Sequence, residues 1–319
     1  MIGAVEKRRL HSASACPDAS HEPPPVAVSV RPALRRTIRD LLRLYRVRDW
    51  IHMLPVPLAT FDLYAPRGRA WLAAGRGVAS AFVILAFGFL LNSVSDRQVD
   101  RDGRKNPLII AGAAGYQYSL AVLLVLSLAL AAVSPVPARL AILSCLVLGV
   151  VYSIGPRLKS VPVAGSLTNA AGFTLMLFFG MSSATLPLGF GYVALAYATL
   201  LLQNQLMHEA GDQVEDRASG IRTTWLTLGP RWTALMAAFA GLGATIAAVH
   251  IVPRAAVVPV VTIASTVLVL AFPLLLSWPR LKAREAARLR VIQRWCAVVL
   301  GAGLYAAWRM GASISQNFG

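Results

Sequence analysis

The sequence predicts an all-α integral membrane protein, a bundle of about nine transmembrane helices. Its 319 residues are 56% hydrophobic and only 14% charged, whereas a soluble domain carries about 25% charged residues. The apolar residues also gather in long runs, and about 20 such residues cross the hydrocarbon core as a helix. Weak alternation with period 2, together with abundant Leu and Ala, disfavours a membrane β-barrel.

Nine segments fit the description of a helical span. Their boundaries follow from where the apolar runs begin and end, and the first is irregular because His52, Pro55, Pro57 and Asp62 interrupt it. The predicted spans are 49–65, 77–95, 116–133, 138–154, 164–183, 187–208, 231–252, 256–277 and 293–310.

A basic tail, residues 1–36, precedes the predicted transmembrane domain, residues 37–319. The tail lacks apolar residues for a core and contains three consecutive prolines, so we predict that it is disordered. It does not read as a signal peptide, because no apolar region follows its positive charges.

The distribution of positive charge predicts the orientation. If the N-terminus lies in the cytosol and the spans alternate, 25 of the 31 Lys and Arg residues fall in cytosolic segments. The same rule and anionic lipids account for the net charge of +17 without nucleic acid as a partner. We therefore predict a protein of the bacterial inner membrane, with membrane lipids around it. The cysteines (Cys16, Cys145 and Cys296) match no metal or disulfide pattern.

Half of the acidic residues occupy two short windows at the predicted cytosolic ends of spans. The windows hold seven of the 14 Asp and Glu residues, namely Asp96, Asp100, Asp102, Glu209, Asp212, Glu215 and Asp216. One acidic loop alone is ordinary for a cytosolic surface. Two windows on the same side of an acid-poor chain favour a functional site.

The spacing within each window indicates a cation site. Polar groups recur every four residues, at Asn92, Asp96 and Asp100 and again at Asn204, His208, Asp212 and Asp216. Residues at this interval share a helix face, where like carboxylates repel unless a cation compensates. Carboxylate and amide oxygens suit Mg²⁺, which commonly bridges to phosphates. Two such sites facing each other would hold a diphosphate.

Basic and polar residues near the windows are candidate phosphate contacts. The ordinary explanation for each Arg or Lys is the positive-inside rule, but lysine is scarce, with only four in the chain. His208 is a candidate base, or a residue that forms a hydrogen bond at a helix end. The candidates are Arg48, Arg104, Lys105, Tyr152, Arg157, Lys159, His208, Glu209 and Arg222.

These motifs resemble those of the intramembrane prenyltransferase superfamily named after UbiA, the 4-hydroxybenzoate polyprenyltransferase. The likeness covers about residues 45–310. Asn92, Asp96 and Asp100 match its first signature, N(D)xxDxxxD. Asp212 and Asp216, followed by Gly-Ile-Arg-Thr-Thr at 220–224, match the second, and residues 152–159 resemble the loop between spans four and five. The chain departs from the pattern at Ser93, where an Asp is usual, and at 105–107, which reads Lys-Asn-Pro where Arg-Pro is common.

The resemblance implies helices around a central cavity under a cap of cytosolic loops. It implies Mg²⁺-dependent transfer of an isoprenyl group from a prenyl diphosphate to a lipophilic or aromatic acceptor, with an aromatic one the more frequent in the family. It also implies that metal is held by Asn92, Asp96, Asp100, Asp212 and Asp216, and that Lys159, Tyr152 and Arg48 contact the diphosphate. The catalytic set is then Asp96, Asp100, Asp212, Asp216 and Lys159.

Two other functions stay open. A secondary transporter also uses acidic residues, but its sites usually lie near the midplane, whereas these acids lie at span ends. A prenyl-diphosphate cyclase on the same scaffold would release pyrophosphate without an acceptor.

Overall fold

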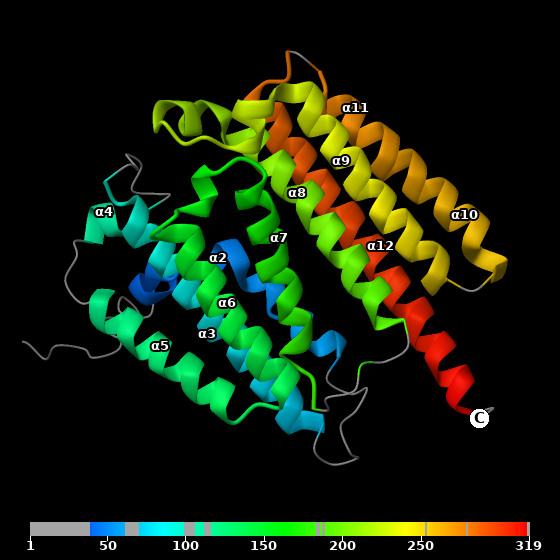
Figure 1. Ribbon diagram of the computed structural model, residues 1–319, viewed down its shortest axis with the longest axis horizontal. Coiled ribbons are helices and arrows are strands. Elements are labelled where there is room, and N and C mark those ends of the chain that lie inside the picture. The colour runs from blue at the N-terminus through cyan, green and yellow to red at the C-terminus, as the bar shows by residue number, and fades with distance from the viewer. Residues whose placement is uncertain are drawn as a thin grey trace, which may run out of the picture. The chain divides into compact units, whose positions relative to one another are not determined.

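The computed structural model describes residues 39–60, 70–98, 106–111, 116–182, 186, 189–252, 254–278 and 280–317, and every regular element in these ranges is helical (Figure 1). The chain divides into the units Met1–Asp40 and Leu41–Gly319. Of the first unit only Arg39 and Asp40 are described, so the predicted tail lies outside the described residues. All elements below belong to the second unit.

In the second unit, residues 41–44 are helical, three short helices follow them, and longer helices come next. The first half contains α2 (Val47–Trp50), η1 (Ile51–Met53), η2 (Val56–Ala59), α3 (Ala70–Asp96), α4 (Leu108–Ala111), α5 (Tyr116–Ala132), α6 (Val136–Ser153), η3 (Leu158–Ser160), α7 (Ala164–Leu175) and η4 (Met176–Phe178). The second half contains α8 (Phe190–Ala218), α9 (Thr224–Ile251), α10 (Arg254–Ala264), the π-helix η5 (Ser265–Ala271), α11 (Phe272–Leu276) and α12 (Ala283–Asn317).

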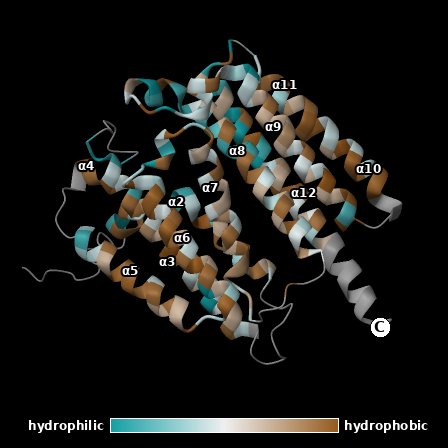
Figure 2. Cartoon of the chain, in the orientation of Figure 1, coloured by the Kyte–Doolittle hydropathy of each residue, from teal (hydrophilic) through white to brown (hydrophobic). Residues whose placement is uncertain are grey.

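The prediction of an all-helical integral membrane protein is confirmed. Within the described ranges, the segments long and apolar enough to cross a membrane are Trp71–Asp96, Val136–Ser153, Thr224–Ile251 and Val257–Leu276. The 17 residues of α5 are apolar but shorter. Figure 2 shows hydrophobic residues along α5, α6 and α10, as lipid-facing helices require. The predicted number of nine spans is not confirmed.

The first predicted span, 49–65, differs from the described structure over residues 49–60. This stretch contains α2, η1 and η2 in place of one helix. Pro55 and Pro57 have no backbone N–H to donate, which interrupts a helix. The Thr60 hydroxyl donates to the Leu177 carbonyl at 2.6 Å, so the broken segment is anchored on η4.

Helix α8 connects two groups of packed helices. In the first group, α3 packs on α5 and α6, and α6 packs on α7. In the second group, α8 packs on α9 and α12, while α9 packs on the run from α10 to α11. Because α7 also packs on α8, the two groups are joined through this helix pair.

A buried amide network ties the π-helix to α8 and α9. The Gln203 amide donates to the Leu268 carbonyl at 2.8 Å and to the Ala237 carbonyl at 2.9 Å. Gln293 donates in turn to the Gln203 oxygen at 3.3 Å. Within a membrane an unsatisfied carbonyl is costly, so the network gives the π-helical carbonyl a donor from a neighbouring helix.

Gly241 allows this close approach, and its replacement is a test of the fold. A Cβ at Gly241 would lie 2.4 Å from the Leu268 carbonyl oxygen. We expect Gly241→Ala to lower the free energy of unfolding by about 1–3 kcal/mol, the usual cost of overpacking. Thermal unfolding in detergent measures it. Gly149→Ala is the matched control, since nothing lies within 4 Å of a Cβ there. Equal melting temperatures for the two variants would contradict the close contact.

Candidate active site

The ammonium of Lys159 is held by three oxygens at the C-terminal end of α3. Its Nζ donates to Asn92 Oδ1 at 2.9 Å and to Ser95 Oγ at 2.9 Å, and it also forms an ion pair with Asp96. Arg157 Nη2 lies 2.8 Å from the same Asp96 oxygen. The side chains of Lys159 and Asp96 are only 8% and 11% exposed. The structure therefore brings together four of the residues predicted from sequence.

A strained loop positions Arg157 and Lys159. Arg157 and Val163 have left-handed φ values of 50° and 64°, and for a β-branched residue such as Val163 this conformation is unusual. Such a residue costs on the order of 1–3 kcal/mol and persists only where its surroundings enforce it. Here the Val163 N–H donates to Thr224 Oγ1 at 2.9 Å. The loop conformation is thus tied to the start of α9.

Gly165 lets this loop pack against the start of α7. A Cβ at Gly165 would lie 2.7 Å from the Leu158 carbonyl oxygen and 3.1 Å from the Lys159 Cα. Only a residue without a Cβ fits under the short helix η3, which carries Lys159.

The second motif lies along α8. His208 Nδ1 and Asp212 Oδ2 are 3.5 Å apart, and their side chains are 36% and 33% exposed. One turn after Asp212, Asp216 is half-buried, and its backbone carbonyl accepts from the Ile221 N–H at 2.9 Å. The four-residue interval predicted from sequence thus falls on a real helix, and α8 continues to Ala218.

Glu209 connects three elements in the protein interior. Its two oxygens accept from the Ser166 hydroxyl at 2.5 Å and from the Trp225 N–H at 3.2 Å. Ser166 also lies 2.7 Å from the Thr224 hydroxyl. Both oxygens of this buried carboxyl group are therefore engaged by protein donors, which favours a structural role over the predicted substrate contact.

Tyr152 lies between the two motifs. Its side chain is within electrostatic range of Asp96, Glu209 and Asp216. Because Asp96 ends α3 and the two other acids lie on α8, the motifs approach each other around Tyr152.

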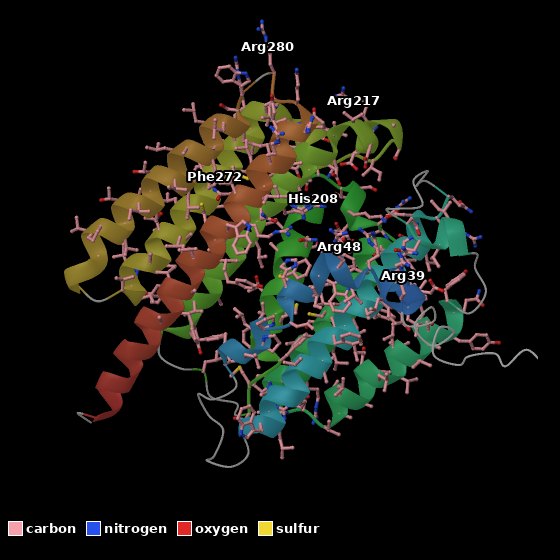
Figure 3. The ribbon with its side chains drawn as sticks, turned by 180° about the vertical axis from the view of Figure 1, so that it is seen from behind. Arg39, Arg48, His208, Arg217, Phe272 and Arg280 are labelled. Atoms are coloured by element: carbon pink, nitrogen blue, oxygen red, sulfur yellow. The ribbon has the colours of Figure 1, made fainter. Side chains whose placement is uncertain are left out.

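The remaining predicted residues are exposed or outside the described ranges. Arg48, on α2, and Arg222, before α9, are exposed. Figure 3 shows Arg48 on α2 and His208 on α8. Asp100, Arg104 and Lys105 lie in 99–105, outside the described residues.

Sequence reasoning missed two polar residues beside the first motif. Ser95 binds Lys159, and its place three residues after Asn92 could have indicated this. The buried Asn106 donates to the Ser93 carbonyl at 2.7 Å, which returns the chain to the end of α3. Ser93 itself, at the position where an Asp is usual, donates to the Phe89 carbonyl of its own helix at 3.0 Å.

The oxygens of Asn92, Ser95 and Asp96 fit a cation, because they already converge on the Lys159 ammonium. They are hard oxygen donors of the kind that Mg²⁺ takes. Among the described residues, no group of three or more His, Cys, Asp or Glu side chains converges on one point.

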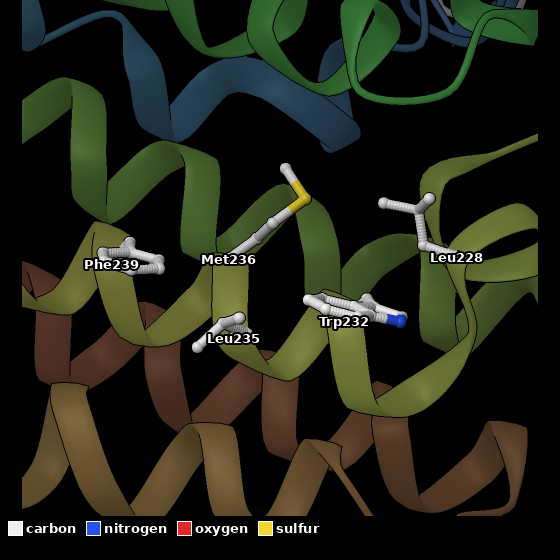
Figure 4. Close-up of a pocket in the computed structure, with 5 residues that line it drawn as sticks. All are labelled: Leu228, Trp232, Leu235, Met236 and Phe239. Atoms are coloured by element: carbon white, nitrogen blue, oxygen red, sulfur yellow. The ribbon is translucent and has the colours of Figure 1, made fainter.

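A separate pocket of about 280 Å³ lies on α9 (Figure 4). Its walls carry no ionisable side chain, so it suits an apolar chain and not a diphosphate. Its lining residues are Leu228, Trp232, Leu235, Met236 and Phe239.

Comparison with known proteins identifies the relatives of this chain. A sequence model of the UbiA prenyltransferase family matches residues 54–308. Digeranylgeranylglyceryl phosphate synthase from Halobacterium salinarum is 30% identical over 178 residues, which is 55% of this chain. The match spans 64% of the length of that relative.

Solved structures share the fold. A UbiA homologue from Archaeoglobus fulgidus, bound to DMAPP and Mg²⁺, has a TM-score of 0.66 at 22% identity, over 85% of this chain and 99% of that one. The same homologue with GPP and Mg²⁺ gives 0.65 at 23% identity and the same coverage. A structure described for digeranylgeranylglyceryl phosphate synthase gives 0.67 at 15% identity, over 86% and 99%.

The structural role of Glu209 can be tested. We expect Glu209→Ala to lower the free energy of unfolding by about 1–3 kcal/mol, because it leaves the buried Trp225 N–H without an acceptor and removes one partner of the Ser166 hydroxyl. Glu209→Gln keeps one acceptor and should cost less. Thermal unfolding in detergent distinguishes the variants. An Ala variant as stable as the wild type would instead favour the substrate contact predicted from sequence.

Proposed function

The chain belongs to the UbiA prenyltransferase family, and we propose that it transfers an isoprenyl group from a prenyl diphosphate to an acceptor in the membrane. One observation carries the proposal: Lys159 and Arg157 meet Asn92 and Asp96 beside Tyr152, which lies within electrostatic range of the second motif. Cations and cation-binding oxygens in one half-buried site suit a diphosphate.

The donor diphosphate would lie between the two motifs. Lys159 and Arg157 donate to its oxygens, and their positive charges stabilise the leaving group as the bond between C1 and oxygen breaks. The electron pair of that bond goes to the diphosphate. The acceptor then forms its bond to the electron-poor C1 and loses a proton.

We also propose Mg²⁺ as the cofactor. It would be held by Asn92, Asp96, Asp100, Asp212 and Asp216, and when bound it would neutralise charge on the diphosphate. Two findings support it: the oxygens of α3 converge on a cation in this structure, and the Archaeoglobus fulgidus homologue binds Mg²⁺ together with DMAPP or GPP.

The membrane location follows from the same chemistry. Long isoprenyl chains partition into lipid, and apolar helices exclude the water that would capture an electron-poor carbon. We propose that the N-terminus and both motifs face the cytosol at a bacterial inner membrane, with residues 1–36 as a tail before the domain 37–319. The proposal rests on the excess of Lys and Arg in the segments on that side.

Two acceptor classes are candidates. The sequence resemblance favours an aromatic acceptor, whereas the name of the Halobacterium salinarum relative points to a lipid glycerol phosphate. Incubation with each class in turn, followed by mass spectrometry of the products, separates them. Pyrophosphate release without any acceptor would indicate the cyclase.

The transfer reaction itself can be tested with variants of both motifs. We expect Asp96→Ala and Asp212→Ala each to lower kcat by about 100-fold or more, the scale for losing one group that stabilises developing charge. The assay measures pyrophosphate released from a prenyl diphosphate with Mg²⁺ and acceptor, with and without EDTA. Arg97→Gln, at an exposed residue next to Asp96, is the control. Full activity in both motif variants would refute the roles assigned to the motifs, and no pyrophosphate release by the wild type would leave transport as the alternative.

A further inference from the structure

Helix α12 brings two arginines to the second motif. It packs along α8 (Figure 1). The Asn204 amide donates to the Arg290 carbonyl at 3.3 Å and to Gln293 Oε1 at 2.7 Å. Asn204 is one helical turn before His208 and two before Asp212. Arg290 therefore lies beside the helix face that carries the second motif, and Arg294, four residues on, shares its side of α12.

The guanidinium groups of Arg290 and Arg294 have hydrogen-bonding capacity to spare. The Nε of Arg290 is buried and has no hydrogen-bond partner. In the described part of the chain, no carboxylate forms an ion pair with either guanidinium; there Asp49 and Asp96 pair with other Arg or Lys residues, and Asp212 lies against His208. A partly buried cation without a partner is unfavourable, because it has lost water and gained no acceptor.

Arg290 and Arg294 lie close enough to each other to repel. Burial and the neighbouring Arg294 lower the pKa of Arg290 to about 10, while Asp212 and Asp49 act in the opposite direction. Both arginines also act electrostatically on His52 of η1. Two arginines of α12 thus lie near each other beside the second motif, and an anion between them would relieve their repulsion.

We propose that Arg290 and Arg294 bind the oxyanion of the acceptor, a phosphate or carboxylate on an otherwise apolar molecule. The planar fork of a guanidinium donates two parallel hydrogen bonds to such a group. The inference rests on the proposed prenyl transfer.

The acceptor fits this region better than the donor does. The proposed contacts of the donor diphosphate are Lys159 and Arg157, which pair with Asp96 of the first motif. Neither of these residues lies on α12. Beyond Arg294, α12 exposes Trp295, Val298 and Val299, which suit the apolar part of a lipid-like acceptor. Arg290 and Arg294 would then determine a preference for anionic over neutral acceptors.

Binding without the donor tests this site separately from catalysis. The probes are geranylgeranylglyceryl phosphate, its neutral alcohol geranylgeranylglycerol, and 4-hydroxybenzoate, added to the purified full-length protein in detergent. We expect at least one anionic probe to bind more tightly than the neutral alcohol. We expect Arg290→Gln with Arg294→Gln to weaken its binding by about tenfold or more, as for a lost charge-assisted hydrogen bond.

Controls make the outcome specific. Arg288→Gln, at an exposed arginine of the same helix, should change nothing. If the double variant unfolds, the single variant Arg294→Gln replaces it in the binding measurement. In the transfer assay the double variant should raise KM for the acceptor and leave KM for the donor unchanged.

Four outcomes overturn the proposal. They are equal binding of anionic and neutral probes, no binding of either anionic probe, unchanged binding by the variants, and displacement of the probe by phosphatidylglycerol at equal concentration, which would identify a lipid headgroup site. Charge-selective binding without transfer to any acceptor would refute prenyl transfer and retain the anion site.

Discussion

The pairing of Lys159 with Asp96 is the interaction on which the site depends. Burying an ammonium and a carboxylate costs several kcal/mol per ion, so the pair must be completed by other hydrogen bonds. Asn92, Ser95 and Arg157 complete it from two segments. The loop that carries Lys159 adopts left-handed backbone at two non-glycine residues to reach this point. The strain is offset where Thr224 accepts from Val163 and where Gly165 leaves room for the loop.

Helix α8 carries both residues that bind neighbouring helices and candidate substrate-facing residues. Gln203 binds the π-helix and Asn204 binds α12, so the middle of α8 organises the helices of the second group. One or two turns on, Glu209 fixes the start of α9, while His208 and Asp212 remain about one-third exposed. Structural and candidate substrate-facing residues therefore alternate along one helix, and a change at either kind affects both packing and chemistry.

The sequence predicts the fold well where the residues of a segment determine its secondary structure by themselves. The apolar run at 116–133 became α5 and that at 138–154 became α6, each within two residues. Predictions fail where distant residues decide. The π-helix needs Gln203 and Gly241 from two other helices, and no pattern within 256–277 encodes them. Likewise α12 begins ten residues before its predicted span, because a charged amphipathic stretch continues the helix beyond the apolar run.

The candidate site shows the same division. Four-residue spacing placed Asn92 with Asp96, and His208 with Asp212, on their helices, since spacing along one helix is local information. Burial depends on other segments and cannot be read from spacing along one helix. Glu209 was therefore grouped with the substrate contacts, although Ser166 and Trp225 donate hydrogen bonds to it. Lys159, 63 residues from Asp96, was expected as a catalytic residue that contacts the diphosphate, and its ion pair with Asp96 was not predicted.

The hydroxyl of Thr224 has a consequence that extends beyond packing. It accepts from Val163 in the loop of Lys159, and it lies 2.7 Å from Ser166, which binds Glu209 of α8. A single side chain thus belongs to the supports of both motifs. A displacement of either the loop of Lys159 or the end of α8 would therefore disturb hydrogen bonds that support the other motif.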